Sequence, residues 1–342
     1  MKENSNVLII CKNYYPSIGG VEKHIYEIQK ILAKKGYTFR IICENRAGFI
    51  SKTESSVIRL KPINIKYFGL LVRWIQMFTF MKAFLDADIV HIHDVFIWVL
   101  PMRLILFRKK FYITHHGWEG KLPISKNSIF QKKLACYLCN NYVLVGKYIA
   151  SIYGLESKNV IYGAAKPNRH PVRVRSRLSV LYLGRLDHST GVSVLLDSLK
   201  QKRFKVVFCG NGELNSACKK FGAVTGFVRN PGRYLSKNKI CIACGYLSTI
   251  EALQQGCFTI VLINSKVRKQ AFNMSPMKSW IKLVRTPRQL SQRIEEFENN
   301  RNHYSERALQ AKKWADHQTW NKLADFYEKL WSAPNGVTIQ MR

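Results

Sequence analysis

Three short segments in the second half of the chain constrain its fold most. They run in the order LYLGRLDHSTG (181–191), FCGNGE (208–213) and GYLSTIEALQQG (245–256). Each reads as an apolar strand that enters a glycine-containing turn or polar loop, where backbone N–H groups can approach a phosphate. The third turn also opens a helix that carries a carboxylate. Together, the segments predict one nucleotide-binding α/β domain.

The first half begins in a similar way. VLIIC (7–11) is followed by a loop that ends in Gly19-Gly20, and then by a helix over 21–35 with apolar residues at helical spacing. Further strands are expected at 37–43, 88–91, 111–114 and 142–145. This alternation predicts a mostly parallel sheet with helices on both faces and ligands at the carboxyl ends of its strands. Two such domains in one chain predict a cleft.

Composition agrees with two ordinary cores, because 342 residues are 47% hydrophobic and 22% charged. The charge balance is unusual: 55 Lys and Arg against 21 Asp and Glu give a formal net charge of +34. An anionic partner is expected, either a nucleoside diphosphate, acidic lipid headgroups or nucleic acid. The basic residues are spread over both halves, which weighs against a nucleic-acid-binding tail.

No membrane-spanning segment is expected. The apolar run at 7–11 is too short for a signal-peptide core, and 68–84 is interrupted by Arg73, Gln76 and Lys82. Nine cysteines without a secretion signal predict reduced thiols in a cytoplasmic protein.

A metal site is not expected, although two patterns suggest one. Cys136-x-x-Cys139 and Cys241-x-x-Cys244 lie about a hundred residues apart, unlike the cysteines of a compact zinc ribbon. His91-x-His93-Asp94 places possible ligands at the end of one strand, where the same residues also fit a strand-end pattern without metal.

The joint order of seven segments resembles glycosyltransferase family 4, which has the GT-B fold. The segments are PSIGGVEKHIYEIQKILAKKGY, DIVHIHD, ITHHG, VLYLGRLD, FCGNGE, STIEALQQG and HQTWNKLADFYEKL. The resemblance covers nearly the whole chain. It implies two Rossmann-like domains that face a cleft, and a C-terminal helix that crosses back to the first domain.

The resemblance also implies a separate binding role for each domain. An acceptor-binding domain is expected over 1–165 and a nucleotide-sugar-binding domain over 179–315. Between them, 166–178 has two prolines, many basic residues and no periodicity, which is typical of a linker. The helix over 316–332 is the one expected to return to the first domain.

In the second domain, Arg185 is the residue expected to neutralise the donor diphosphate. An ion pair with Asp187 is the structural alternative. Glu251 matches the carboxylate that accepts hydrogen bonds from the ribose, while Ser248 to Glu251 also fits a helix capping box. The remaining donor-binding candidates are glycines and helix N-terminal residues, namely Gly184, Gly210, Tyr246, Leu247, Ser248 and Thr249.

Two positions depart from the family pattern. Thr190 stands where a lysine shortly after the arginine is usual, and Ala243 stands where the first of two paired glutamates is usual. The first departure removes a positive contact to the diphosphate. The second leaves the identity of the sugar open and raises the chance of an altered or lost activity.

In the first domain, Gly19 and Gly20 match the family loop that approaches the donor phosphates, with an ordinary helix-entry turn as the alternative. His116 matches the active-site histidine, placed to hydrogen-bond the donor sugar, and His115 is expected to be structural. Weaker acceptor-side candidates are Glu22, His24 and Asp94.

The expected activity is a metal-independent, retaining transfer of a hexose from a nucleoside diphosphate sugar to an acceptor hydroxyl, in surface glycan, polysaccharide or glycolipid synthesis. No cofactor is expected. The expected acceptor is lipid-linked or a saccharide. Aromatic and basic residues between Phe68 and Lys110 favour a lipid-linked or membrane-proximal acceptor and peripheral attachment to the inner, anionic face of a membrane, with buried helix faces as the alternative explanation of the aromatics. The alternatives are a non-catalytic nucleotide-sugar-binding protein and a basic nucleic-acid-binding protein.

Overall fold

A computed structural model describes residues 5–339 except 18, 45–55, 64–67, 119–122, 167–178 and 202–203. The chain divides into two compact units. Met1–Ile161 and Trp320–Arg342 form the N-terminal unit, and Tyr162–Thr319 form the C-terminal unit. Apart from Lys166, the expected linker lies outside the described residues.

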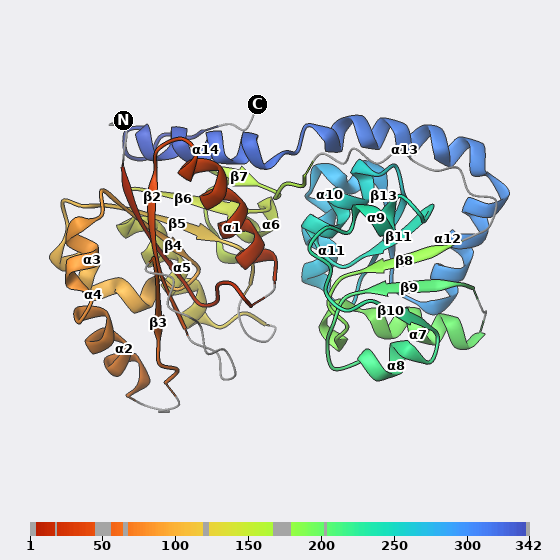
Figure 1. Ribbon diagram of the computed structural model, residues 1–342, viewed down its shortest axis with the longest axis horizontal. Coiled ribbons are helices and arrows are strands. Elements are labelled where there is room, and N and C mark those ends of the chain that lie inside the picture. The colour runs from red at the N-terminus through yellow and green to blue at the C-terminus, as the bar shows by residue number, and fades with distance from the viewer. Residues whose placement is uncertain are drawn as a thin grey trace. The chain divides into compact units, whose positions relative to one another are not determined.

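The described part of the N-terminal unit contains a seven-stranded parallel sheet (Figure 1). Its strand order is β3-β2-β1-β4-β5-β6-β7. The strands are β1 (Asn6–Cys11), β2 (Thr38–Glu44), β3 (Val57–Leu60), β4 (Ile89–His93), β5 (Lys110–His115), β6 (Asn141–Val145) and β7 (Val160–Ile161). The helices are α1 (Gly20–Ala33), α2 (Gly69–Phe78), α3 (Met81–Asp86), η1 (Phe96–Val99), α4 (Leu100–Ile105), α5 (Lys126–Leu138), α6 (Lys147–Tyr153) and α14 (Trp320–Ser332).

Alternation of side chains along these strands assigns a different set of helices to each face of the sheet. Leu8 and Ile10 of β1 belong to a core cluster that includes residues of α2, α3, η1, α4 and α5. Ile9, between them, faces a small space lined by residues of α1 and α14. The C-terminal helix α14 therefore packs on the same sheet face as α1, which it contacts.

The described part of the C-terminal unit contains a six-stranded parallel sheet of order β10-β9-β8-β11-β12-β13. The strands are β8 (Val180–Leu183), β9 (Val206–Cys209), β10 (Gly222–Val224), β11 (Ile240–Ala243), β12 (Phe258–Leu262) and β13 (Ile281–Val284). The helices are η2 (His188–Thr190), α7 (Val192–Gln201), α8 (Asn215–Lys219), α9 (Gly232–Leu235), α10 (Tyr246–Gln254), α11 (Lys266–Asn273), η3 (Pro276–Trp280), α12 (Pro287–Asn299) and α13 (Arg301–Asp316).

The two faces of this sheet are also covered by different helices. Tyr182 and Ile242 pack with α7 and α12 in one cluster. Leu181 and Leu183 point to the opposite face, where a second cluster includes residues of α9 and α10. Strands this apolar on both faces are typical of a parallel sheet between two helix layers.

Each sheet has its topological switch point beside its first strand. In the N-terminal unit β1 pairs with both β2 and β4, and in the C-terminal unit β8 pairs with both β9 and β11. Ligands of such sheets bind outside the carboxyl ends of the strands at this point. The predicted α/β class with two Rossmann-like domains is confirmed.

Within the described residues, none of the helices combines the length and apolar character needed to cross a bilayer. The nine cysteines are all free thiols.

Candidate active site

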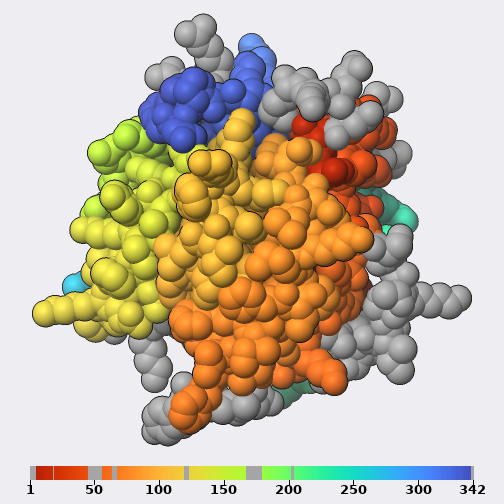
Figure 2. Space-filling model, turned by 90° about the vertical axis from the view of Figure 1, so that its left-hand side faces the viewer, coloured from red at the N-terminus to blue at the C-terminus, as the bar shows by residue number. Residues whose placement is uncertain are grey.

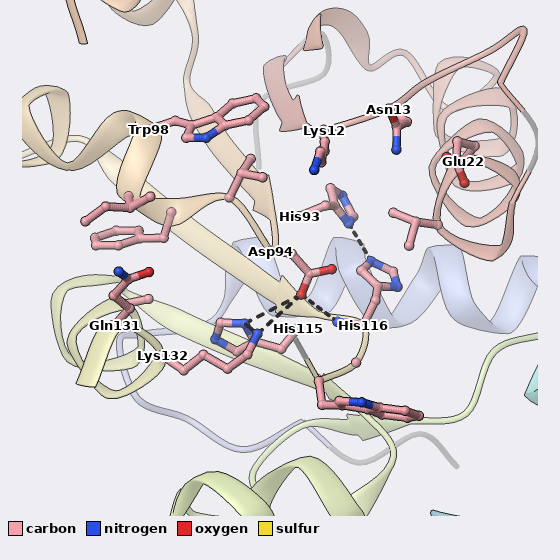
Figure 3. A pocket seen from close by; sticks show the side chains of 17 residues that line it. Lys12, Asn13, Glu22, His93, Asp94, Trp98, His115, His116, Gln131 and Lys132 are labelled. Carbon is pink, nitrogen blue, oxygen red and sulfur yellow. Dashed lines mark hydrogen bonds and ion pairs between the residues drawn. The ribbon is translucent and has the colours of Figure 1, made fainter. Parts of the chain in front are cut away.

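A cavity of about 640 Å³ opens in the N-terminal unit at the carboxyl ends of β1, β4 and β5 (Figure 3). This is the switch point of the sheet, where the chain leaves β1 on one side and β4 on the other. Its polar and aromatic lining includes Lys12, Asn13, Glu22, His93, Asp94, Trp98, His115, His116, Gln131 and Lys132. Three predicted site residues of the first domain therefore lie at one cavity, namely Glu22, Asp94 and His116, and His115, expected to be structural, lines it with them.

His115 and His116 leave the end of β5 in opposite directions, because consecutive residues of a strand point to opposite faces. The His115 ring lies against α5, with Lys132 Nζ 3.2 Å from its Nδ1 and Cys136 Sγ 3.5 Å from its Nε2. His116 turns toward α1 and β4, where its Nε2 lies 2.8 Å from Nδ1 of His93. The structural role predicted for His115 fits this buried position.

Asp94 directly follows β4 in a left-handed backbone conformation, with φ of 66°. Few residues other than glycine adopt this conformation, and those that do are often found at functional sites. Its carboxylate accepts the backbone N–H of His116 (2.9 Å) and lies 3.6 Å from Lys132 Nζ. Burial alone would raise the pKa of Asp94, but its contacts with His115, His116 and Lys132 lower the pKa well below its usual range. Asp94 is therefore an ionised carboxylate at neutral pH.

The histidines on the other side of the cavity are neutral. Burial, together with the neighbouring cationic groups, lowers the pKa of His116 to about 4, although Asp94 acts in the opposite direction. Burial also lowers the pKa of His93, and His91, His116 and His24 lower it further. At neutral pH each ring then carries one N–H donor and one acceptor nitrogen.

A chain of hydrogen bonds links α14 to His24, and its first member fixes the donors as far as Thr114. Trp331 Nε1 can only donate, and it donates to His91 Nδ1 (2.9 Å). Since His91 is neutral, its Nε2–H donates to Thr114 Oγ1 (2.9 Å). Thr114 Oγ1 is hydrogen-bonded to the Tyr327 hydroxyl (3.1 Å), which is also hydrogen-bonded to His24 Nε2 (2.9 Å).

This chain places His24 beside the cavity and not in its lining. Its ring centre is 5.0 Å from that of His116, in an edge-on contact. His24 therefore fits a positioning role next to the predicted active-site histidine. His91, with both ring nitrogens engaged, has no lone pair left for a metal ion.

Gly19 is the residue before α1, and Gly20 is the first residue of that helix. A Cβ on Gly19 would collide with the carboxylate of Glu22, which folds back over the start of the helix. The helix-entry turn named as an alternative is thus present. Contact of this loop with donor phosphates remains a prediction.

In the C-terminal unit, the turn after β8 packs closely against the turn after β9. A Cβ on Gly210 would collide with the carbonyl oxygen of Gly184, and one on Gly184, where φ is 156°, would collide with Cys244 Sγ. Both glycines are therefore required by the packing of these turns. The packing leaves Arg185 at the switch point with its side chain 65% exposed.

The ion pair predicted as an alternative for Arg185 is present. Its Nη1 lies 3.2 Å from Asp187 Oδ2, and its Nη2 donates to Ser189 Oγ (3.1 Å). A pair this exposed adds little stability, so the guanidinium remains available to an anion.

Thr190, at the position of the usual lysine, is buried. Its hydroxyl oxygen lies 2.9 Å from the Arg185 carbonyl oxygen and 2.7 Å from that of Asp187, and it accepts a hydrogen bond from Tyr182 (2.8 Å). The side chain therefore stabilises the turn and supplies no charge to its surface.

The capping box that Ser248 to Glu251 would form, given as the alternative for Glu251, is wrong, because the helix starts earlier than this prediction requires. Helix α10 starts at Tyr246 with Gly245 before it, so Ser248 is the third helical residue and Glu251 lies a turn further on. Ser248 Oγ accepts the N–H groups of Gly245 (3.1 Å) and Cys244 (3.2 Å). Glu251 has no part in capping, and ribose binding stays its predicted role.

The other predicted residues of α10 are held by structural contacts. Tyr246 OH donates to the Ala271 carbonyl (2.8 Å), and the buried Thr249 donates to the Gly245 carbonyl (2.8 Å). The Leu247 side chain lies over Gly163. Any contact of these three residues with a donor would therefore come from their backbone.

Sequence reasoning gave no site role to His93, Lys132, Tyr327 or Arg268. Lys132 and Tyr327 look like ordinary helix residues, and only the fold brings them to the histidines. His93 was considered only as a metal ligand. Among the described residues, no group of three or more His, Cys, Asp or Glu is arranged to hold a metal ion. A metal-independent reaction stays a prediction.

Residues 18–153 match the profile of the family described as Glycosyltransferase Family 4. Over 234 residues, 61% of this chain and 48% of the relative, the sequence is 23% identical to a subunit of the human phosphatidylinositol N-acetylglucosaminyltransferase. Over 232 residues, 61% of this chain and 60% of the relative, it is 25% identical to an uncharacterized glycosyltransferase of Methanocaldococcus jannaschii. The chain thus spans about half to three fifths of the length of these curated relatives.

The fold is similar to that of Anabaena Alr3699/HepE, solved in complex with UDP and glucose, with a TM-score of 0.72 at 12% identity. The likeness covers 96% of this chain and 100% of that one. At this identity it shows the shared GT-B fold alone. The family match in the first half and the two relatives at low identity make the chain similar to glycosyltransferase family 4, as a divergent sequence.

Proposed function

We propose that the protein is a retaining, metal-independent glycosyltransferase that moves a hexose from a nucleoside diphosphate sugar to an acceptor hydroxyl. One observation carries the proposal: each of the two sheets has a polar group at its switch point, His116 and Asp94 in one unit and Arg185 in the other. The likeness to family 4 supports retention of configuration. The UDP and glucose bound to the Anabaena protein support the class of donor.

In the proposed reaction, the bond between the sugar C1 and the diphosphate oxygen breaks, and its electron pair leaves with the nucleoside diphosphate. The acceptor oxygen bonds to C1 on the same face, and its proton passes to the departing phosphate oxygen. Arg185 neutralises the charge that develops on the leaving group. Backbone N–H groups at the start of α10, at Tyr246 and Leu247, aid it, and Glu251 accepts from the ribose hydroxyls.

The cavity of the N-terminal unit supplies the acceptor side. The neutral His116 ring offers a nitrogen to a hydroxyl of the donor sugar. Asp94, which is ionised and fixed by Lys132 and the His116 N–H, accepts a hydrogen bond from the attacking hydroxyl and orients it. The Trp98 ring, with the Arg73 guanidinium carbon 4.4 Å from its centre, forms part of the wall that would contact the rest of the acceptor.

The proposed acceptor is lipid-linked, and the proposed location is the inner face of an anionic membrane. Helix α2 differs from an ordinary surface helix, because Arg73 is buried together with Met77 while an apolar stripe is exposed. The stripe consists of Phe68, Leu71, Ile75 and Phe78. Figure 2 views the face of the N-terminal unit where α2, α3 and α4 lie (orange). Leu104, Ile105 and Phe107 are also exposed there, next to the basic run 108–110.

A second candidate is a nucleotide-sugar-binding protein without turnover. Ala243 is fully buried at the end of β11, so the position of the usual first glutamate offers no side chain to a sugar. With Thr190 also turned inward, two contacts of the family pattern are missing. Binding of donor without transfer would favour this candidate.

The test is release of nucleoside diphosphate from a panel of UDP-, GDP- and ADP-sugars, measured with and without a membrane lipid extract as acceptor. We expect release from one class of donor, stimulated by the extract and reduced at least a hundredfold in His116→Ala. The matched control is His303→Ala, at an exposed histidine of α13, which should retain full activity. Binding of a nucleotide sugar without any release would replace the transferase by the non-catalytic candidate.

A further inference from the structure

We propose that Arg268 of α11 is a second cationic contact for the donor diphosphate, beside Arg185. This inference rests on the proposed function and adds to it a residue and a preference for diphosphate over monophosphate.

Arg268 ties together the two loops of the switch point in the C-terminal unit. Its Nη1 donates to the carbonyl oxygens of Thr190 (3.0 Å) and Cys244 (2.9 Å), and its Nη2 donates to that of Ser189 (3.1 Å). Ser189 and Thr190 belong to the loop after β8, and Cys244 directly follows β11. One guanidinium thus lies where the carboxyl ends of two adjacent strands meet.

Arg185 also lies next to Cys244. The Cys244 thiol lies against Gly184 and accepts the backbone N–H of Arg185. Both guanidinium groups, that of Arg268 more strongly than that of Arg185, act electrostatically on this thiol. Two positive side chains from different elements therefore border one small group.

The charges at this place are unbalanced. Arg185 has Asp187 as an ion-pair partner, whereas Arg268 has no carboxylate within ion-pair distance among the described residues. Its three protein partners are neutral carbonyls, and like charges near one another repel. A bound anion would offset both the unpaired charge and the repulsion.

Arg268 also has N–H donors that the described hydrogen bonds do not use. A guanidinium has five N–H groups, and three of those of Arg268 are accounted for, which leaves Nε–H and one Nη2–H without a partner in the described structure. These two lie on adjacent nitrogens, the fork that matches two phosphate oxygens. The fixed position of the other three N–H groups holds this fork in place.

The need for a second cation follows from Thr190 and Asp187. Thr190 is buried and uncharged, and Asp187 offsets part of the charge of Arg185. The loop after β8 therefore supplies less than one net positive charge to a ligand with several negative charges. Arg268 supplies the rest, so its effect should be larger for a diphosphate than for a monophosphate.

Calorimetric titration with UDP, GDP and ADP first identifies the preferred base of the wild type. The measured quantity is then the ratio of the Kd of that nucleoside monophosphate to the Kd of its diphosphate. We expect Arg268→Gln to lower this ratio about tenfold, since a charge-assisted contact is worth about 1.4 kcal/mol or more, and 1.4 kcal/mol is a factor of ten.

The matched control is Asn264→Ala. Asn264 Nδ2 donates to the same Ser189 carbonyl (2.7 Å) and to that of His188 (3.3 Å), without charge. Its loss loosens the same loop and should leave the ratio within about twofold of wild type. An equal fall in both variants, or an unchanged ratio in folded Arg268→Gln, would refute the role of Arg268. A wild type that binds none of the three nucleotides would overturn the proposed function itself.

In Arg268→His, a change of pH switches the charge of residue 268 within one variant. The test therefore does not depend on two variants being equally stable. Imidazole is charged at pH 5.5 and neutral at pH 8. We expect the diphosphate Kd of this variant to tighten at least fivefold more than that of the wild type between pH 8 and pH 5.5. Parallel pH dependence in the two proteins contradicts a phosphate contact at this position.

Discussion

His93 Nδ1 and His116 Nε2 lie 2.8 Å apart although 23 residues separate them. The register of the sheet explains the contact, because His93 pairs with Thr114 across β4 and β5, and His116 is two residues further on the same face. Both rings have a lowered pKa, first of all because of burial. One of them donates and the other accepts, so the two rings cannot both be protonated.

The first prediction concerns stability at acid pH. The pKa values of four clustered histidines lie below the unfolded value of about 6.5: about 3 for His91, about 4 for His116, and lowered for His24 and His93. Above pH 7 these rings are neutral in both states. As the pH falls from about 6.5 toward 4, the unfolded chain takes up protons that the folded chain cannot. The free energy of unfolding should therefore fall, by up to about 1.4 kcal/mol per pH unit for each ring.

Urea denaturation between pH 7.5 and pH 4.5 measures this slope. In His24→Gln one buried ring is removed, so the protein should be less stable at pH 7.5 but show a shallower pH profile. The exposed His303→Gln should reproduce the wild-type profile. A free energy of unfolding that does not change down to pH 4.5 would mean that these rings can be charged in the folded state.

The second prediction is that Tyr327→Phe destabilises the N-terminal unit by about 1 to 2 kcal/mol. The change removes the hydroxyl that is hydrogen-bonded to both His24 Nε2 and Thr114 Oγ1, and leaves each of these buried groups without that partner. The measurement is the midpoint of urea denaturation. Tyr137→Phe, at a side chain 85% exposed, is the matched control and should have no effect.

Much of the fold could be predicted because periodicity is a local property. The strand predicted at 142–145 is observed as Asn141–Val145, and the helix at 21–35 as Gly20–Ala33. The apolar segment 68–84 forms the two short helices α2 and α3. Local patterns could not show that Arg73 would be buried against Glu44 and Trp98, since that depends on β2 and η1, distant in the sequence.

Less of the site could be predicted from residues alone. Arg185, Asp94 and His116 follow strands, so their place at the carboxyl edge of a sheet was predictable. Lys132 could not be assigned, because only the packing of α5 under β5 brings its amine to Asp94. The first residue of α10 was mispredicted for a different reason. Ser248 is the third helical residue, and its Oγ accepts the N–H of Gly245, the residue before the helix. A serine in this role and a serine that itself precedes a helix look alike in the sequence.

The third prediction is that Arg185→Ala weakens binding of the nucleoside diphosphate by about 2 kcal/mol, close to thirtyfold in Kd. The melting temperature should not change, because the ion pair with Asp187 is largely exposed. Calorimetry gives both the affinity and the enthalpy. Arg233→Ala, at an exposed arginine of α9, controls for general loss of positive charge; equal loss in both variants would remove Arg185 from the site.

The fourth prediction separates two neighbours on α10. Glu251→Gln should weaken binding of the nucleoside diphosphate, because a ribose contact is lost, while the melting temperature stays the same. Ser248→Ala should do the reverse and cost about 1 kcal/mol of stability, since its Oγ accepts two backbone N–H groups. Normal affinity in Glu251→Gln would contradict the ribose contact.

The last prediction concerns the membrane. Because the chain carries a net charge of +34 and α2 exposes an apolar stripe, the purified protein should sediment with anionic liposomes at low salt and much less with neutral ones. Binding should weaken as ionic strength rises, since the Debye length is about 8 Å at physiological salt and shorter above it.

Two substitutions of equal exposure test which surface makes the contact. Ile75 on α2 and Leu309 on α13 are both 58% exposed, and a glutamate at either position changes the net charge equally. Ile75→Glu should reduce sedimentation with anionic liposomes severalfold, because it places a carboxylate within the apolar stripe. Leu309→Glu should change it little. Equal loss in the two variants would show that charge alone holds the protein at the surface, without the stripe. Absence of liposome binding, together with tight, salt-dependent binding of RNA, would instead favour a nucleic acid as the anionic partner.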